Sequence, residues 1–428
     1  MKLPGDKSLA HRALLLAALA RTPSRIENLP DGDDVKRTAT AIATLMVGPV
    51  RPADGVTIDC GNSGTLVRLL MGFCAGGVLA GAAHDVTLIG DASLSRRPMG
   101  RVAVPLRTLL GSDVVELTPA GTLPARVRWA PLAFRRLGAV DTGVASAQVK
   151  SALVLAAREK DFDVVIHEAT ATRDHTERMI ASLLARPGSL GTLRVEPHEM
   201  GASIHVRGPL AWDGFDLELP GDPSSAALLA AFAIASGLAF AAEDLLVNPR
   251  RAGFWRVLVR MGLDVDMRET GERLGEPVGD IAITQRGPLT GVTVPARELP
   301  DLVDEVPALV VVALHARGTT RIEGAGELRV KESDRLALLV QLVGSFGGRA
   351  DIDGDALVVH GRAPSLAAPC ATLLRIRTDG DHRIAMAAHI LARIDDIEVS
   401  LDVEDAAATS FPGFAAALDS LDPRGRRL

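Results

Sequence analysis

The sequence contains no tyrosine, and aromatic residues make up only 3% of its 428 positions. Apolar residues nevertheless account for 47% of the chain, so its hydrophobic cores must be built from Ala, Val, Leu and Ile. At roughly 150 residues per domain, a chain of this length is expected to form two or three domains.

Cysteine is also scarce. Cys60, Cys74 and Cys370 are odd in number and have no Cys-x-x-Cys spacing, which disfavours both a disulfide framework and a zinc site. No HxH or HExxH pattern accompanies Asp174-His175 or Asp381-His382, so helix capping explains these pairs better than metal binding does. We therefore expect no metal site and a reducing, cytoplasmic location.

An excess of positive charge is missing as well. The 47 Lys and Arg against 53 Asp and Glu give a net charge of −6, which disfavours nucleic acids and anionic membrane surfaces as partners. The longest uncharged apolar run, Ala226 to Ala242, is at the short limit for a membrane span, and we expect a buried helix followed by a strand. The N-terminus superficially resembles a signal peptide, but Asp6 and His11 crowd its apolar stretch and favour an amphipathic helix.

Helical and extended patterns alternate along the chain, with Gly and Pro between them, which indicates an α/β protein. Short β-branched runs at Asp163–Ile166 and Ala356–Val359 predict strands. Gly271–Gly279 is expected to be a surface loop, and Pro423–Leu428 a frayed basic tail. Apolar runs of helical length begin at Ser8, Ser146, Asp174, Ser224, Val306, Glu332 and His382.

One pattern occurs twice, about half a chain apart. Pro4–Ser8 (PGDKS) and Pro220–Ser225 (PGDPSS) each open an Ala- and Leu-rich helical run. This internal similarity predicts two related halves with a boundary near Leu219–Gly221.

Several predicted helices begin with Gly, Ser or Asp and carry a cation in or near the first turn. A helix N-terminus presents free N–H groups and a partial positive charge, and a side-chain cation adds charge-assisted hydrogen bonds. If these ends converge, they form a cleft for a substrate with several negative groups, although each one alone is better explained as a helix cap or a solvated face. The segments are Gly5–Arg12, Gly61–Arg68, Leu328–Arg335 and Gly380–Arg383.

Asp304 and Glu332 are the acid–base candidates. Asp304 lies just before the apolar run Ala308–Leu314, where partial desolvation would raise its pKa. Glu332 is flanked by Lys331 and Arg335, whose charges would lower its pKa. Two carboxyl groups in different environments suit paired acid–base work, but their spacing alone does not distinguish this role from a structural one.

Taken together, nine segments resemble the 3-phosphoshikimate 1-carboxyvinyltransferase (5-enolpyruvylshikimate-3-phosphate synthase) family over nearly the whole chain. The order of the segments makes the resemblance specific, and the forms SerAlaGln at 146–148 and ThrArgAspHisThr at 172–176 resemble its second bacterial class. The segments are Pro4–Arg12, Gly61–Thr65, Gly90–Met99, Ala145–Ser151, Thr172–Thr176, Pro220–Ser225, Glu327–Arg335, Gly380–Met386 and Thr409–Pro412.

The resemblance implies two similar lobes, residues 5–219 and 220–428, each built from three βαβαββ units. The active site would lie in the interlobe cleft, which closes by a hinge near residues 5 and 220. It implies a monomeric cytoplasmic transferase of chorismate and aromatic amino acid biosynthesis. The enzyme would move the enolpyruvyl group of phosphoenolpyruvate to the 5-hydroxyl of shikimate 3-phosphate and release phosphate. These two small molecules would be its partners, and no metal or cofactor would be needed.

The resemblance also assigns residues, position by position. Because both substrates are anionic, they need cations from both lobes, and arginine forks fit phosphate and carboxylate groups. Glu332 resembles the family's proton donor, Asp304 its proton acceptor and Lys7 a charge stabiliser. Shikimate 3-phosphate would be held by Lys7, Ser8, Arg12, Ser146, Ala147, Gln148, Asp304 and Lys331. Phosphoenolpyruvate would be held by Lys7, Gly64, Arg97, Gln148, Arg335 and Arg383.

The chain departs from the family pattern in its N-terminal regions. It begins three residues before Pro4, where members usually carry a further strand that completes the second lobe, so residues 1–4 are expected to join that lobe. The stretch from Ala43 to Asp59 is also short. Gly64 stands where an Ala narrows the phosphoenolpyruvate pocket in some members, which predicts sensitivity to glyphosate, a herbicide that occupies this pocket.

Two alternatives stay open. The enolpyruvyl transferases that act on UDP-N-acetylglucosamine share the lobes, but they use a loop cysteine and a Lys-Asn pair, whereas here Ser8 follows Lys7 and no cysteine lies near Arg97. A phosphometabolite-binding relative that has lost its activity would keep the same cations. Phosphate release from the two substrates separates an enzyme from such a binder.

Overall fold

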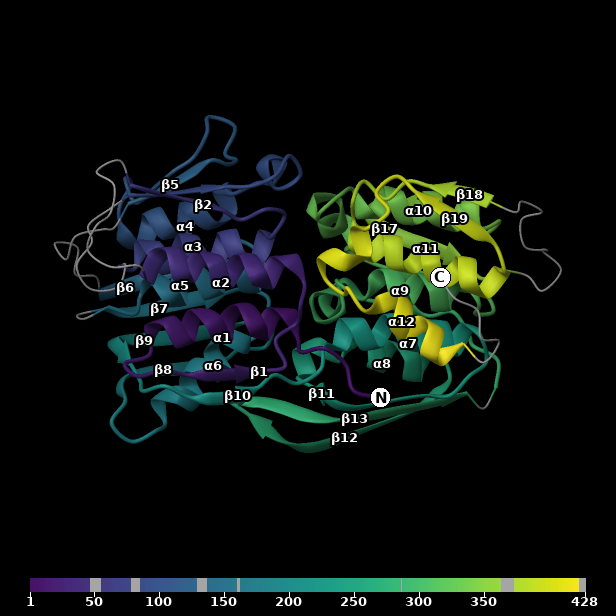
Figure 1. Cartoon of the computed structure of the whole chain (residues 1–428), viewed down its shortest axis with the longest axis horizontal. Coiled ribbons are helices and arrows are strands. Elements are labelled where there is room, and N and C mark those ends of the chain that lie inside the picture. The colour runs from purple at the N-terminus through teal and green to yellow at the C-terminus, as the bar shows by residue number, and fades with distance from the viewer. Residues whose placement is uncertain are drawn as a thin grey trace.

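The computed structural model describes residues 1–46, 55–77, 85–128, 137–159, 162–285, 287–362 and 373–422. Two lobes lie side by side, the first drawn from purple to teal and the second from green to yellow (Figure 1). Cys370, the basic tail 423–428 and residues 47–54 of the short stretch fall outside the described residues. Among the described residues, no helix has the length and apolar character needed to span a membrane.

The first lobe contains three sheets and six α-helices in the described part of the chain. The sheets are β1(Arg25–Glu27)-β10(Asp216–Glu218), β2(Val56–Asp59)-β3(Val86–Ile89)-β5(Ala125–Val127)-β4(Val115–Glu116) and β6(Leu137–Asp141)-β7(Asp163–Glu168)-β9(Ala202–Ala211)-β8(Leu190–Pro197). The helices are α1(Lys7–Leu19), α2(Asp33–Met46), α3(Gly64–Ala75), α4(Gly100–Leu110), α5(Ala147–Ala156) and α6(His175–Leu184), with the 3₁₀ turn η1(Leu94–Arg96).

The described part of the second lobe has the same make-up. Its sheets are β11(Phe240–Leu246)-β13(Glu276–Gln285)-β12(Leu263–Arg273), β14(Thr293–Val294)-β15(Thr319–Ile322)-β17(Ala356–His360)-β16(Arg349–Asp353) and β18(Leu373–Ile376)-β19(Glu398–Leu401). Its helices are α7(Pro223–Ala235), α8(Gly253–Arg260), α9(Val306–Leu314), α10(Arg335–Ser345), α11(His382–Asp395) and α12(Phe414–Leu421). The 3₁₀ turns are η2(Pro249–Arg251), η3(Ala296–Asp301), η4(Ala325–Val330) and η5(Ala406–Thr409).

One sheet pattern recurs in both lobes. Each four-stranded sheet joins its first two strands in parallel and adds the other two antiparallel: β2-β3-β5-β4, β6-β7-β9-β8 and β14-β15-β17-β16. A parallel pair requires a crossover, usually a helix, whereas the antiparallel strands follow as a hairpin. The recurrence is therefore a repeated βαβαββ unit, and the fold is the mixed α/β architecture that the resemblance implied.

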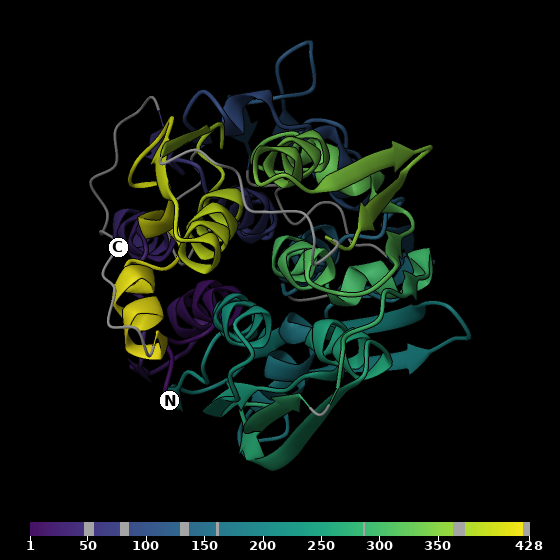
Figure 2. The ribbon, with the colours of Figure 1, turned by 90° about the vertical axis from the view of Figure 1, so that its right-hand side faces the viewer.

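The predicted helices and strands form near their expected positions. The run from Ala226 to Ala242 covers α7 and the start of β11, as predicted, and α7 is buried at every position except its last. The helix expected at Glu332 begins instead at Arg335. Viewed from the second lobe, its helices are seen nearly end-on and the strands lie around them (Figure 2).

Small residues allow the helices of the cores to pack closely. A Cβ atom on Gly72 of α3 would lie 2.0 Å from the carbonyl oxygen of Ala152 in α5, so only glycine fits there. α9 is buried along its whole length and contains only Val, Pro, Ala and Leu. The scarcity of aromatic residues thus corresponds to aliphatic cores in which helices approach at short range.

The two lobes are joined where the chain crosses between them twice. Gly5 and Gly221 form an antiparallel bridge, with Asp6 N donating to Pro220 O at 2.8 Å and Asp222 N to Pro4 O at 3.0 Å. A side chain at residue 5 would collide with Asn28 O, 2.2 Å from the position of a Cβ atom. Leu3 packs in the core around α7, α9 and α11. The division into residues 5–219 and 220–428 stays a prediction.

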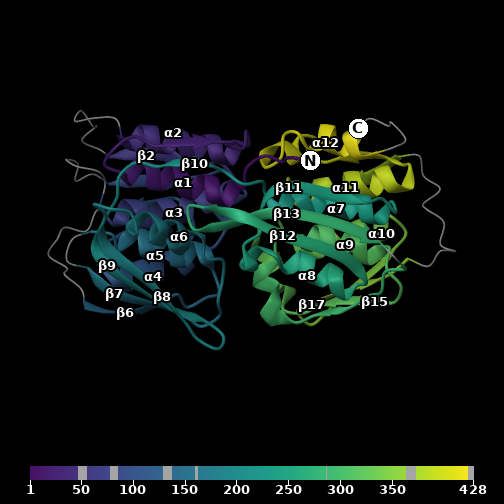
Figure 3. The ribbon, with the colours of Figure 1, turned by 90° about the horizontal axis from the view of Figure 1, so that it is seen from below.

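A β-hairpin forms where we expected a surface loop at Gly271–Gly279. β12 and β13 pair antiparallel, and the turn residues Leu274 and Gly275 have φ angles of 49° and 81°, as tight hairpin turns require. The prediction was wrong because the apolar alternation of β12 ends at Met267, and the exposed residues between Met267 and the turn are polar or glycine, without the pattern that indicates a strand. The hairpin reaches from the second lobe to the first (Figure 3), where Leu274 joins the hydrophobic core.

Candidate active site

Several helices begin where the lobes meet, and acidic or hydroxyl side chains cap them. Asp6 Oδ1 accepts a hydrogen bond from Leu9 N at 2.8 Å at the start of α1, and Ser63 Oγ accepts from Leu66 N at 3.3 Å at α3. Asp381 accepts from the backbone of Arg383 and Ile384, so the predicted capping at α11 is confirmed. These caps explain why helices start beside Lys7, Gly64 and Arg383, whose positions then coincide with the positive ends of the helix dipoles.

Glu332 lies between cations of both lobes. Arg335 Nη2 donates to Glu332 Oε2 at 2.5 Å, and Arg97 Nη1 of the first lobe is 3.5 Å from Glu332 Oε1. Ser93 Oγ, also of the first lobe, donates to Glu332 O at 2.8 Å. Burial opposes the ionised form, but Arg335 and Arg97 outweigh it and hold the pKa of Glu332 well below its usual range, in the predicted direction.

Asp304 is surrounded by guanidinium groups. Arg173 Nη1 of the first lobe donates to its Oδ2 at 2.6 Å, Arg335 Nη1 is 3.8 Å from Oδ1, and Arg383 Nη1 donates to the backbone oxygen at 2.8 Å. Burial raises the pKa of Asp304, yet Arg173, Arg383, Lys331 and Arg335 more than offset this and hold it well below its usual range. The prediction of a raised pKa for Asp304 was wrong because it took into account only the apolar residues that follow in sequence, and not the cations that the fold brings close.

The first lobe supplies a second group of donors around α3 and α5. Arg68 Nη1 donates to Gln148 Oε1 at 2.6 Å, and Gln148 Nε2 donates to Thr65 Oγ1 at 2.9 Å. A Cβ atom on Gly64 would lie 2.7 Å from Arg97 Nη1 and 3.0 Å from Arg68 Nη1. Gly64 therefore leaves room for both guanidinium groups.

Lys7, Ser8 and Arg12 lie on α1. Lys7 Nζ pairs with Asp34 Oδ2 at 2.9 Å, and its charge also acts on Glu332. Arg12 is buried, and it donates to Ser8 O at 2.9 Å and to the hydroxyl groups of Thr176 and Ser151 at 2.8 and 3.1 Å.

Some predicted site residues have few or no side-chain contacts with the other predicted site residues. In the described part of the chain, Ser146 and Ala147 at the start of α5 form no side-chain hydrogen bond with another predicted site residue. Lys331 Nζ lies 4.0 Å from Glu327 Oε1. Burial lowers the pKa of Lys331 below its usual value, although the charge of Asp304 acts in the opposite direction. Arg12 contacts Ser8 among the predicted residues.

Sequence reasoning missed Arg173 and Asp34 as members of this cluster, and it marked Arg68 as a cation near a helix start without assigning it to a substrate. Arg173 lay within a quoted motif, but nothing local showed that it would pair with Asp304, 131 positions away. Arg68 carried the signal of a cation one turn into a helix, whereas Asp34 is one of several aspartates at the start of α2 with no distinguishing pattern.

Several buried donors of these arginines lack a hydrogen-bond acceptor among the described residues. They include Arg335 Nη1, Arg97 Nε, Arg173 Nη2 and Arg68 Nε. A buried donor without an acceptor is costly, on the order of 1–3 kcal/mol and more when charged. The arrangement therefore suits a ligand that brings several anionic oxygens between the lobes.

A hollow of about 600 Å³ lies elsewhere, on the outer surface of the β6-β7-β9-β8 sheet, and none of the predicted site residues lines it. Two of its polar groups are already paired, since Ser203 Oγ contacts His167 Nδ1 at 2.8 Å, and Ser203 Oγ also contacts His198 Nε2 at 2.6 Å. We therefore place the candidate active site between the lobes.

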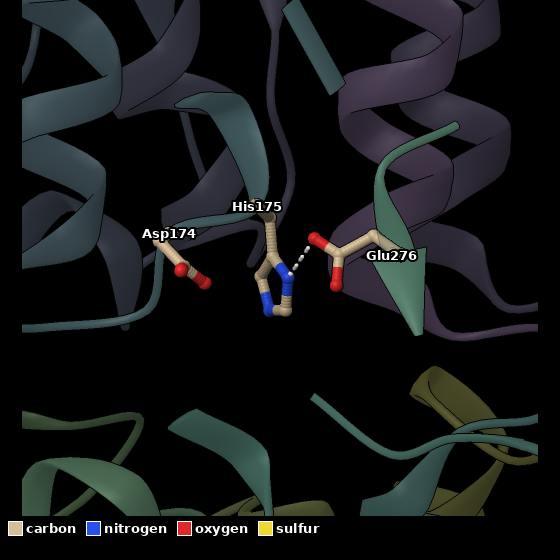
Figure 4. A group of neighbouring side chains, drawn as sticks. All are labelled: Asp174, His175 and Glu276. Atoms are coloured by element: carbon tan, nitrogen blue, oxygen red, sulfur yellow. Dashed lines mark hydrogen bonds and ion pairs between the residues drawn. The ribbon is translucent and has the colours of Figure 1, made fainter. Parts of the chain in front are cut away.

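Asp174, His175 and Glu276 form a second cluster, with ligand atoms close enough to share a cation (Figure 4). His175 Nδ1 and Glu276 Oε1 are 2.8 Å apart. Asn248 Nδ2 donates to Asp174 Oδ1 and to Glu276 Oε2, each at 2.8 Å, which occupies carboxylate oxygens that a metal ion would need. Asp174 also accepts from Arg178 Nε at 2.7 Å and makes no capping bond, so the predicted capping role was wrong at this position.

This cluster should make stability depend on pH. Burial raises the pKa of Glu276 from 4.5 to about 8, so this residue's contribution to stability is complete below 4.5 and is lost as the pH rises through about 8. We expect the wild-type free energy of unfolding to fall by up to about 1.4 kcal/mol per pH unit in this window, and that of Glu276→Gln to fall less. Denaturant titrations across the window measure both slopes.

The clearest difference should lie at the alkaline end of that window. Burial lowers the pKa of His175 well below 6.5, so its contribution is present above 6.5 and is lost on acidification, opposite to that of Glu276. Glu196→Gln, which changes an exposed partner of His205, serves as the control. Equal slopes for Glu276→Gln and the wild type between pH 6.5 and about 8 would contradict the assignment.

Two lobes of recurring βαβαββ units, with arginines from both around two carboxylates, define the class of the protein: the two-lobed enolpyruvyl transferase fold. Over 98% of the chain, the fold matches the solved structure of EPSP synthase from Acinetobacter baumannii, with a TM-score of 0.75, 30% identity and 95% of that chain covered. The enolpyruvyl transferase NikO from Streptomyces tendae matches with a TM-score of 0.62 at 18% identity, covering 98% of this chain and 94% of NikO, and supports the fold alone.

Residues 1–418 match the family model of EPSP synthase (3-phosphoshikimate 1-carboxyvinyltransferase). The 3-phosphoshikimate 1-carboxyvinyltransferase of Phenylobacterium zucineum is 38% identical over 98% of this chain and 92% of its own length. That of Acidithiobacillus ferrooxidans is 39% identical over 97% and 93%. The chain belongs to the EPSP synthase family.

Proposed function

We propose that the chain transfers the enolpyruvyl group of phosphoenolpyruvate to the 5-hydroxyl of shikimate 3-phosphate in aromatic amino acid and chorismate biosynthesis, with release of phosphate. Membership of the family over residues 1–418 supports this reaction. The observation that carries the placement of the site is Glu332, held between Arg335 and Arg97 of opposite lobes. We further propose a monomeric cytoplasmic enzyme whose substrates are its only required ligands.

The arrangement suits the binding of two anions at once. Arg97, Arg335 and Arg383 would hold the phosphate and carboxylate of phosphoenolpyruvate, with Lys7, Gly64 and Gln148 beside them. Lys7, Ser8, Arg12 and the start of α5 at Ser146, Ala147 and Gln148, together with Lys331, would hold shikimate 3-phosphate, with Asp304 at its 5-hydroxyl. The buried guanidinium donors without an acceptor in the described chain support this assignment.

The proposed reaction proceeds by addition and elimination. Glu332 donates a proton to the methylene carbon of phosphoenolpyruvate while the 5-hydroxyl oxygen attacks the adjacent carbon and Asp304 takes the hydroxyl proton. The Glu332 carboxylate then takes a proton back from the methyl group of the tetrahedral intermediate as the bond between carbon and the phosphate oxygen breaks, and the leaving phosphate takes the proton held by Asp304, which regenerates the vinyl group and both reacting groups. Lys7 stabilises the developing charge, and fixed cations contribute most of the rate enhancement.

The low pKa of Glu332 is compatible with a proton-donating role. Its ionised form depends on Arg335 and Arg97, which are the groups proposed to bind phosphoenolpyruvate. When substrate oxygens take over these guanidinium groups, the carboxylate loses its partners and gains negative neighbours, both of which raise its pKa. Substrate binding thus converts Glu332 from a paired carboxylate into a proton donor.

Phosphate release in the presence of both substrates is the direct test. Purified full-length protein should release one phosphate for each enolpyruvyl shikimate 3-phosphate formed, and neither substrate alone should give phosphate. Binding of both substrates without turnover would instead indicate a phosphometabolite binder. Turnover only with UDP-N-acetylglucosamine as the acceptor would indicate the related transferase.

A further inference from the structure

Arg251 forms a buried charged cluster at the junction of the lobes. The residue ends η2, and 2% of its side chain is exposed. Its Nη1 donates to Asp6 Oδ2 at 2.8 Å, and its Nη2 donates to Ser224 Oγ at 2.9 Å. Nη2 also lies 3.4 Å from Asp222 Oδ1 and 3.6 Å from Glu305 Oε1.

Two of these carboxylates begin the paired helices of the repeat. Asp6 caps α1, and Asp222 Oδ1 caps α7 by accepting from Ser224 N at 2.7 Å. Asp222 Oδ2 also accepts from Lys7 N at 3.4 Å. Asp6 precedes Lys7 in the chain, and Asp222 accepts a hydrogen bond from the backbone N–H of Lys7. Because the guanidinium group of Arg251 contacts both carboxylates, it holds the backbone of Lys7 in place.

The third carboxylate adjoins the proposed base. Glu305 follows Asp304 directly and is buried, with 2% of the residue exposed. It forms a short hydrogen bond with Ser224 Oγ, which also accepts from Arg251. The path from Arg251 to Asp304 therefore consists of one hydroxyl, one carboxylate and one peptide unit, and Ser224 and Glu305 on this path are buried.

We propose that Arg251 is a positioning residue that aligns Lys7 with Asp304. This inference rests on the proposed function, in which Lys7 and Asp304 act on the same substrate pair. A planar guanidinium group donates in several fixed directions at once, so a single side chain holds the starts of α1 and α7 and the segment before α9 in one geometry. Lysine keeps the charge at this place but offers a single nitrogen.

A purely structural ion cluster would give a different pattern from a positioning residue. Loss of stability alone lowers the melting temperature and leaves the folded enzyme's kcat intact at lower temperature. Loss of alignment lowers kcat in the folded enzyme, since misplacement by about 1 Å costs on the order of 100-fold. Measuring the changes in kcat and in KM separately, on the folded enzyme, therefore distinguishes a structural role from a positioning role.

The test compares Arg251→Lys with the wild type and with Arg362→Lys, all as full-length protein. Arg362 is the matched control because it makes a forked ion pair with Asp395, at 2.7 and 2.5 Å, away from the predicted site residues. We expect Arg251→Lys to lower kcat about 10- to 100-fold in phosphate release while each KM changes by less than about threefold. The control should keep its kcat within about threefold of the wild type, as substitutions without a catalytic contact do.

A second variant keeps the test decisive if Arg251→Lys is poorly folded. Glu305→Gln loosens the same path at its other end, and we expect it to lower kcat with little change in KM. In the double variant that combines Arg251→Lys with Glu305→Gln, the loss of kcat should exceed that of the worse single variant by no more than about threefold. The reason is that the effects of residues that act as a unit are not additive.

The outcomes divide clearly. Wild-type turnover with unchanged kcat in Arg251→Lys or Glu305→Gln overturns the inference and leaves the proposed function standing. Multiplicative losses in the double variant, or an equal loss in Arg362→Lys, also overturn it. A wild-type protein that releases no phosphate from the two substrates contradicts the proposed function, and the positioning role with it.

Discussion

Glu332→Gln is expected to lower kcat by about 10²- to 10⁴-fold, the usual contribution of a general acid or base, while both substrates still bind. The amide has the size of the carboxyl group and still accepts a hydrogen bond from Arg335, but it has no acidic proton to donate to carbon. It also removes the negative charge that competes with phosphoenolpyruvate for Arg335 and Arg97. Phosphate-release kinetics and calorimetric titration with each substrate measure the two effects separately.

The control for this prediction is Glu323→Gln. Glu323 lies in the same lobe, 44% of its side chain is exposed, and it pairs at the surface with Arg321. We expect this variant to retain the wild-type kcat. Turnover of Glu332→Gln at the wild-type rate would remove Glu332 from the acid role, and a loss of substrate binding would show that its main task is to organise the arginines.

Asp304→Asn is expected to have the second largest effect, again about 10²- to 10⁴-fold in kcat. Asparagine cannot take the proton of the 5-hydroxyl group, although it still accepts a hydrogen bond from Arg173. It also leaves Arg173, Arg383, Lys331 and Arg335 without the negative charge that now balances them. The surplus cations should keep shikimate 3-phosphate bound, so the loss should appear in kcat rather than in calorimetric affinity.

Asp301→Asn provides the matched control for Asp304→Asn. Asp301 lies three residues earlier, and its carboxylate pairs with Arg256 at 2.6 Å. Its loss should lower stability and leave kcat near the wild-type value. If Asp304→Asn turned over at the wild-type rate, another group would have to accept the proton.

The same electrostatic effects act on the two proposed reacting groups, Asp304 and Glu332. Both are carboxylates whose pKa values burial raises and arginines lower, and in both cases the arginines come from the two lobes. Arg173 of the first lobe reaches Asp304, and Arg97 of the first lobe reaches Glu332. Contact between the lobes therefore adds to the stabilisation of both carboxylates, which links substrate binding to protonation through ordinary Coulomb interactions.

The local features of the protein could be predicted from its amino-acid sequence. Helix starts such as Pro4–Ser8 and Pro220–Ser225 were readable because capping residues, glycine and apolar periodicity act over a few neighbouring positions. The aliphatic cores followed from composition, and the order of nine segments indicated the family that residues 1–418 match. The lowered pKa of Glu332 was also predictable, because Arg335 is only three positions away.

Contacts between groups far apart in the sequence could not be predicted in this way, because they depend on the complete fold. The pKa of Asp304 was predicted with the wrong sign because Arg173 is 131 positions away and no local pattern records that distance. The β12–β13 hairpin could not be recognised because its residues near the turn are exposed, and the partners of Arg251 lie up to 245 positions away from it. Local propensities are set by neighbours in sequence, whereas charge pairing and alignment depend on how two separately folded cores are placed against each other, and only folding brings those groups within a few ångströms.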